Sequence, residues 1–220
     1  MRRPSLALGL AVAVTALTAC AAPAPADGFP SSTAAPLTRF AAEFLGATTM
    51  PAPEATVTPA AGTWDDVVVP AGFELVLITS GEDPAAVTVA DAVRRYAAAH
   101  AVALTVLPTR DDDDVEAAIE QAVAAHPDLV VGAGDGVVDV FALLTAQHLD
   151  TPFLLVGSQL PEPTANVTAV VWDGAGFRGS GLGSAHADPD AVSPERALEA
   201  MGAGVTAVLH DLTGIVLDLG

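Results

Sequence analysis

Residues 128–136 read DLVVGAGDG, a short apolar run that ends in a glycine-rich turn. A second run of the same kind, FLLV, occupies residues 153–156. Polar and apolar residues hardly alternate within either run, which is typical of parallel strands covered by helices on both faces. The two runs therefore predict the interior of a parallel sheet.

Outward from these runs, short β-branched segments alternate with longer alanine-rich segments that have helical spacing. Strands are predicted at residues 73–79, 103–107, 128–131, 153–156, 167–172 and 214–219. Helices are predicted at residues 37–45, 85–100, 111–125, 137–149 and 193–210, and residues 63–67 are expected to form an edge strand or a turn. This alternation predicts an α/β fold with an open, doubly wound, mostly parallel sheet and right-handed crossovers.

The charge of the chain excludes one class of partner. Its 27 Asp and Glu residues outnumber 8 basic residues, all of them arginine, and the formal net charge is −19. A protein that binds nucleic acid needs a basic surface to neutralise phosphates, so nucleic acid is not expected as a partner. The single cysteine, Cys20, cannot form a structural disulfide within the chain.

The N-terminus predicts export and a lipid anchor. Arg2 and Arg3 precede an apolar run at residues 6–17 that is too short to span a bilayer as a helix. The sequence LTAC, which ends at Cys20, resembles the lipobox of bacterial lipoproteins. The alternative is an ordinary signal peptide cut near Ala22. We therefore predict four parts of the chain. They are a lipoprotein signal peptide (1–19), a disordered tether from the lipidated Cys20 (20–36), an N-terminal extension with a short helix (37–72) and a single lobe (73–220).

Four segments carry a resemblance to a known family. They are residues 127–134 (PDLVVGAG), 151–157 (TPFLLVG), 166–172 (NVTAVVW) and 174–182 (GAGFRGSGL). Their order resembles the basic membrane protein family of substrate-binding lipoproteins, and the resemblance covers residues 73–183. It implies a type I periplasmic-binding-protein fold and a role in ABC-type uptake of a nucleoside or another small solute. Members of that family have two lobes, whereas this chain has residues for one.

Ligands of open α/β sheets bind beyond the carboxyl ends of the strands, near the point where strand order reverses. The candidate loops are therefore residues 80–83, 109–111, 132–136 and 157–159. The residues predicted to contact a solute are Ser80, Asp83, Asp135, Ser158 and Trp172.

Other functions fit the sequence less well. The glycines at 132–136 lack the GxGxxG spacing of a dinucleotide site, and the four aspartates at 111–114 suit a helix start better than a cation loop. A small secreted hydrolase would need a nucleophile motif such as GxSxG. We predict a non-catalytic, lipid-anchored, extracytoplasmic solute-binding protein without cofactor or metal, whose partner is a membrane permease or a chain that supplies a second lobe. The alternative is an envelope interaction module that has lost solute binding and docks through an exposed sheet edge.

Overall fold

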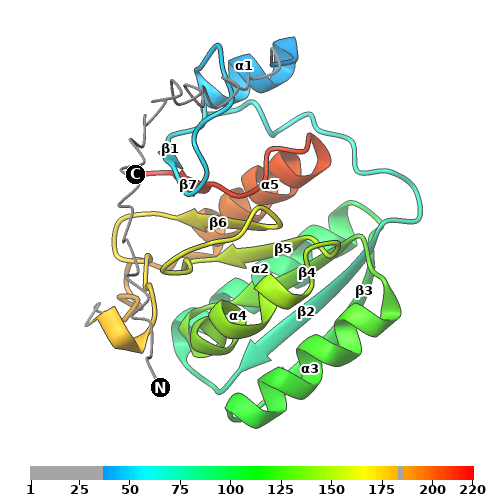
Figure 1. Cartoon of the computed structure of the whole chain (residues 1–220), viewed down its shortest axis with the longest axis vertical. Coiled ribbons are helices and arrows are strands. Elements are labelled where there is room, and N and C mark those ends of the chain that lie inside the picture. The colour runs from blue at the N-terminus through cyan, green and yellow to red at the C-terminus, as the bar shows by residue number, and fades with distance from the viewer. Residues whose placement is uncertain (1–36, 183–185) are drawn as a thin grey trace, which may run out of the picture. The chain divides into compact units, whose positions relative to one another are not determined.

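The computed structural model describes residues 37–182 and 186–220, and these residues build one seven-stranded sheet (Figure 1). The strand order is β1-β7-β6-β5-β4-β2-β3, and every neighbouring pair is parallel. The strands are β1 (Thr56–Val57), β2 (Glu74–Ser80), β3 (Ala103–Thr109), β4 (Leu129–Ala133), β5 (Phe153–Val156), β6 (Val167–Val171) and β7 (Val216–Asp218). The predicted α/β class and open parallel sheet are confirmed.

The helices begin at residues that can satisfy free amide groups. A side-chain oxygen of Asp83 accepts a hydrogen bond from the Ala86 N–H at the start of α2, and Asp111 and Ser193 cap α3 and α5 in the same way. The helices are α1 (Arg39–Leu45), α2 (Pro84–Ala99), α3 (Asp112–Ala125), α4 (Val138–Leu144) and α5 (Pro194–Leu209), with 3-10 turns η1 (Asp135–Val137), η2 (Thr145–Gln147) and η3 (Ser180–Leu182).

The sheet is covered on both faces. Helices α2 and α5 pack together over one face, and α3 and α4 cover the other (Figure 1). Strand side chains alternate between the two cores. Leu75, Leu129 and Leu154 point toward α2 and α5, whereas Val76 and Val130 point toward α3 and α4. Burial on both faces explains why the strands lack polar alternation.

One connection between strands departs from the expected hand. The connections through α2, α3 and α4 have the same hand. Helix α2 lies on one face and leads in one direction along the sheet, from β2 to β3, whereas α3 and α4 lie on the other face and lead in the opposite direction, to β4 and then β5. Helix α5 lies on the α2 face, yet it leads from β6 to β7 in the direction opposite to β2 and β3. The β6–α5–β7 crossover is therefore left-handed, a rare arrangement, and the expectation that all crossovers are right-handed is wrong at this connection.

Residues 37–72 share the core of the sheet. Phe44 of α1 is fully buried, and its ring meets Trp64 edge-on with ring centroids 6.3 Å apart. Strand β1, which the sequence did not predict, pairs with β7 at the sheet edge. Residues 63–66 form turns, and no strand is present at 63–67.

The leader, the lipobox with Cys20 and the tether lie outside the described residues. Among the residues that are described, no helix combines the length and the apolar character that a membrane span requires.

Candidate functional site

A cavity of about 600 Å³ lies at the carboxyl ends of the strands. It sits where strand order reverses, because β2 lies between β3 and β4, and the chain leaves β2 and β4 toward opposite faces of the sheet. The walls come from the loop between β2 and α2, the turn after β4, the start of α3 and α4, and the segment around η3. The lining residues are Ser80, Gly81, Glu82, Asp83, Asp112, Asp135, Gly136, Asp139, Phe177, Ser180, His186 and Ala187.

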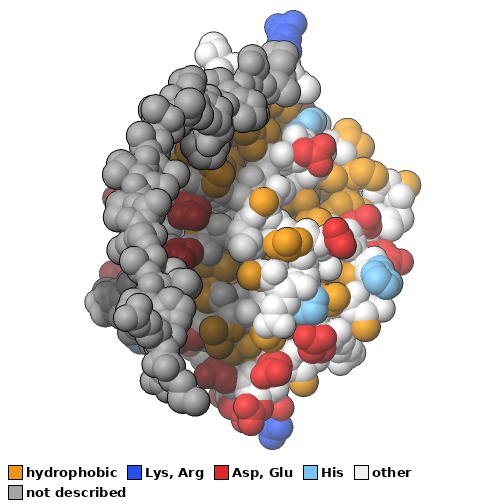
Figure 2. Space-filling model, in the orientation of Figure 1, with side chains coloured by type: hydrophobic (Ala, Val, Ile, Leu, Met, Phe, Trp, Pro, Cys, Tyr) orange, Lys and Arg blue, Asp and Glu red, His pale blue; other side chains and the backbone are white. Residues whose placement is uncertain are grey.

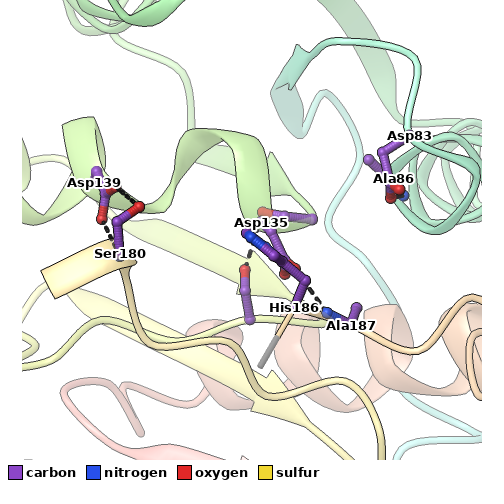
Figure 3. Close-up of polar contacts among 9 residues, drawn as sticks. Asp83, Ala86, Asp135, Asp139, Ser180, His186 and Ala187 are labelled. Atoms are coloured by element: carbon purple, nitrogen blue, oxygen red, sulfur yellow. Dashed lines mark hydrogen bonds and ion pairs between the residues drawn. The ribbon is translucent and has the colours of Figure 1, made fainter. Parts of the chain in front are cut away.

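Asp135 follows the turn that closes β4. Gly134 makes this turn with φ +74°, and a Cβ atom there would lie 2.7 Å from the Ala86 Cβ, so glycine is required. The Oδ2 atom of Asp135 accepts a hydrogen bond of 2.8 Å from the Ala187 N–H and lies 3.4 Å from Nδ1 of His186 (Figure 3). Segments 52 residues apart are thereby joined across the cavity.

The remaining oxygen of Asp135, Oδ1, is shielded from solvent and has no hydrogen-bond partner among the described residues. Burial raises the pKa of Asp135, and the negative charge of Asp83 adds to this shift, whereas the hydrogen bonds from Ala187 and His186 lower the pKa by less. Holding the ionised form at this position therefore costs free energy. A donor or a positive charge brought to Oδ1 would offset that cost.

Asp139 makes a second link across the cavity. Its Oδ1 accepts from the Ser180 N–H at 3.0 Å, and its Oδ2 accepts from the Ser180 Oγ at 2.6 Å (Figure 3). The helix α4 is thus connected to η3, and both oxygens of Asp139 are engaged within the chain.

Three of the five predicted solute contacts line the cavity, namely Ser80, Asp83 and Asp135. Ser158 and Trp172 do not line it. Ser158 is fully buried and donates a hydrogen bond of 3.1 Å to the Gly134 carbonyl, while the indole Nε1 of Trp172 donates to the Ala191 carbonyl at 3.0 Å. The Ser158 hydrogen bond connects the turns after β5 and β4, and the Trp172 hydrogen bond connects the end of β6 to the segment before α5.

The five predicted solute contacts include none from the opposite wall of the cavity, because Phe177 is interpreted from the sequence as a packing residue. The His186 imidazole stacks on the Phe177 ring with centroids 4.7 Å apart and an interplanar angle of 22°. Phe177, Ser180 and His186 lie between β6 and α5, where the sequence has no strand or long helix, so no periodic pattern placed them near the sheet. The aromatic residue inside the glycine-rich segment 174–182 was the available signal.

The described residues that line the cavity carry a strong excess of negative charge. Glu82, Asp83, Asp112, Asp135 and Asp139 line it, and no Lys or Arg of the described part of the chain does. Figure 2 shows acidic side chains gathered at the lower end of the molecule, where α3 begins. Within residues 37–182 and 186–220, no three His, Cys, Asp or Glu side chains are arranged to hold a metal ion.

No family model and no curated protein matches the chain. Solved structures with similar folds include solute-binding proteins of ABC transporters. One from Aeropyrum pernix K1 has 18% identity and a TM-score of 0.40 over 47% of this chain and 29% of its own. GanP, a glucose-galactose binding protein from Geobacillus stearothermophilus, has 17% identity and a TM-score of 0.38 over 68% of this chain and 58% of its own. A sugar ABC transporter protein from Yersinia enterocolitica has 14% identity and a TM-score of 0.38 over 70% of this chain and 53% of its own. The chain thus spans under a third of the first of these proteins and just over half of the other two.

Proposed function

We propose that this chain is a non-catalytic, extracytoplasmic solute-binding protein, held at the membrane by a lipid on Cys20, whose single lobe offers its cavity to a small solute. The observation that carries the proposal is the convergence of Ser80, Asp83 and Asp135 in one cavity at the switch point of a parallel sheet. Open α/β sheets bind their ligands at this position.

The cavity is large enough for a small solute, but one lobe alone should bind that solute weakly. The cavity has a volume of about 600 Å³, within the range of small-molecule sites. A single lobe contacts a solute from one side only, so less of the solute surface is buried than between two closing lobes. We therefore expect weak affinity unless a permease or another chain covers the open side.

The left-handed crossover supports a relation to two-lobed proteins. In this chain the 22 residues that join β6 to α5 stand where such a protein would cross to its second lobe and return. A helix that returns from another lobe is free to pack on either face of the sheet, because the handedness rule applies to direct crossovers. The position of α5 on the α2 face is therefore compatible with descent from a two-lobed protein.

The sheet edge gives little support to the alternative function, an interaction module that docks by strand addition. Ala103 and Thr109 of β3 form backbone hydrogen bonds toward β2, so the backbone of Pro108 faces outward. Proline has no N–H to donate, and its presence on an edge strand opposes pairing with another chain. The other edge strand, β1, has two residues.

A thermal-shift screen of the full-length chain tests solute binding. The panel holds nucleosides, sugars, amino acids, small carboxylates and small organic cations. We expect the melting temperature to rise with the concentration of one class, and to rise less in Asp135→Asn than in the matched control Glu116→Gln, which changes an exposed carboxylate on α3. A folded protein that responds to no class would contradict the proposal.

The lipid anchor is tested separately. Wild-type protein expressed in bacteria is expected to fractionate with membranes and to incorporate labelled palmitate, whereas Cys20→Ser is expected to lose the label. Equal labelling of the two proteins would contradict lipidation of Cys20.

A further inference from the structure

Four carboxylate oxygens of the cavity already accept hydrogen bonds from the chain. Oδ2 of Asp83 accepts from the Ala86 N–H at 3.0 Å, both oxygens of Asp139 accept from Ser180, and Oδ2 of Asp135 accepts from Ala187. The oxygens without a partner among the described residues are of two kinds: those of Glu82, Asp83 and Asp112 belong to exposed side chains that water can solvate, whereas Oδ1 of Asp135 is buried. A buried carboxylate oxygen without a donor is unfavourable, so this atom is where a solute has most to gain.

A group from the chain itself already occupies the space beside this carboxylate. The His186 imidazole stacks on the Phe177 ring. Its Nδ1 is 3.4 Å from Oδ2 of Asp135 (Figure 3). The His186 side chain is nevertheless 78% exposed, so little packing holds it there. A planar, nitrogen-containing ring between an aromatic face and a carboxylate is the arrangement that a planar cation adopts in a binding site.

The charge of the cavity selects among solutes. Among residues 37–182 and 186–220, five carboxylates line the cavity and no Lys or Arg balances them, so an anionic solute would be repelled. A neutral solute gains hydrogen bonds but no charge compensation. A planar cation gains both, because a guanidinium group can donate two parallel hydrogen bonds to a carboxylate while its plane stacks on an aromatic ring.

We infer, on the basis of the proposed function, that the solute is a small planar organic cation of the guanidinium or imidazolium class. It displaces the His186 ring, stacks on Phe177 and donates to the carboxylate of Asp135. His186 thus competes with the solute for the position beside Asp135 and Phe177.

Three probes of similar size separate the contributions: butylguanidinium, butylammonium and butylurea, measured by thermal shift and calorimetry on the full-length chain at constant ionic strength. Butylguanidinium is expected to bind at least tenfold more tightly than either of the others, since only it is both planar and charged. Asp135→Asn is expected to weaken its binding at least tenfold, and Phe177→Leu several-fold. His186→Ala is expected to strengthen it several-fold, and the control Glu116→Gln to leave it unchanged.

Several outcomes would overturn the inference. Equal binding of butylguanidinium and butylammonium would indicate general attraction to an acidic surface, and unchanged or weaker binding in His186→Ala would exclude displacement of the imidazole. Binding of a sugar or nucleoside in place of the cation would overturn this inference and leave the proposed function intact. A response to no solute in the wider panel would overturn both. Because Asp135→Asn and His186→Ala change polar side chains outside the two cores, they test the inference even if Phe177→Leu does not fold.

Discussion

Two groups of aspartates meet at the same edge of the sheet, and they differ in what surrounds them. At the start of α3, Asp111 and Asp113 are exposed, and Asp114 forms an exposed ion pair of 3.0 Å with Arg110. In the cavity, Asp135 is largely buried, with 15% of its side chain exposed, and accepts a hydrogen bond from a distant segment.

This difference decides what each group can do. Water solvates the exposed aspartates, so they stabilise the α3 terminus without being available as a defined site. Around Asp135, the surrounding residues have replaced the water and left one oxygen without a donor. The number of acidic residues in a segment therefore does not indicate a binding site, whereas the burial of a carboxylate without a donor does. Four changes, in order of decreasing effect, test the comparison.

The largest effect is expected in the turn that positions Asp135. Gly134→Ala would place a Cβ atom 2.7 Å from the Ala86 Cβ at a φ of +74°, and strain together with overpacking should reduce the free energy of unfolding by about 3 kcal/mol. The matched control is Gly81→Ala, where φ is +72° and no atom lies within 4 Å, so a loss of about 1 kcal/mol is expected. Urea unfolding measures both, and equal losses would show that close packing does not hold this turn.

The next effect concerns the cap of α3. Asp111→Ala removes the oxygen that accepts from the Asp114 N–H at 3.0 Å, and a loss of about 1 kcal/mol is expected from the lost cap. Asp111→Asn keeps an acceptor and should be close to wild type. A loss in Asp111→Asn as large as in Asp111→Ala would assign the effect to charge rather than to the hydrogen bond.

A smaller effect, which depends on pH, is expected at Asp135. Because burial raises the pKa of Asp135, its carboxylate binds a proton more tightly in the folded protein than in the unfolded chain. The stability of the wild type should therefore fall as the pH rises from the ordinary pKa of an aspartate toward the raised one. Asp135→Asn lacks this fall, so its stability relative to wild type should increase with pH across that window. Urea unfolding between pH 4 and pH 7 measures this trend, and a constant difference would contradict it.

The smallest effect is expected at Asp113, which is exposed and has no hydrogen-bond or ion-pair partner among the described residues. Asp113→Asn should change the free energy of unfolding by less than about 0.5 kcal/mol at every pH. It should also leave solute binding unchanged. A loss of solute binding in this variant would show that the exposed aspartates of α3, and not Asp135 alone, hold the solute.

Much of the fold was predictable because its signals are local. The six predicted strands correspond to β2 through β7, and helices α2, α3 and α5 lie within about one residue of their predicted ranges. The predicted helix at 137–149 is shorter, since α4 ends at Leu144 and a 3-10 turn follows, in which the Thr145 hydroxyl donates to the Phe141 carbonyl. Strand β1 was missed because two residues carry no periodic pattern.

The site was predictable only in part. The loops after β2 and β4 follow from strand positions and the rule for open sheets, and they contain Ser80, Asp83 and Asp135. Phe177 and His186 belong to a long irregular connection, and their approach to Asp135 depends on contacts between distant segments. Nothing local distinguishes Ser158, whose hydroxyl bonds a neighbouring turn, from a serine that faces a solute.

The sequence by itself determined the strands, the helices, their order and the acidic character of the loops, because hydrophobic spacing and helix caps act over a few residues. Only the tertiary structure decided which acids are buried, which side chains share the cavity, and that α5 returns on the face of α2 to make a left-handed crossover. The reason is physical. Burial and pairing depend on the packing of segments far apart in the chain, and local spacing carries no record of which segments will meet.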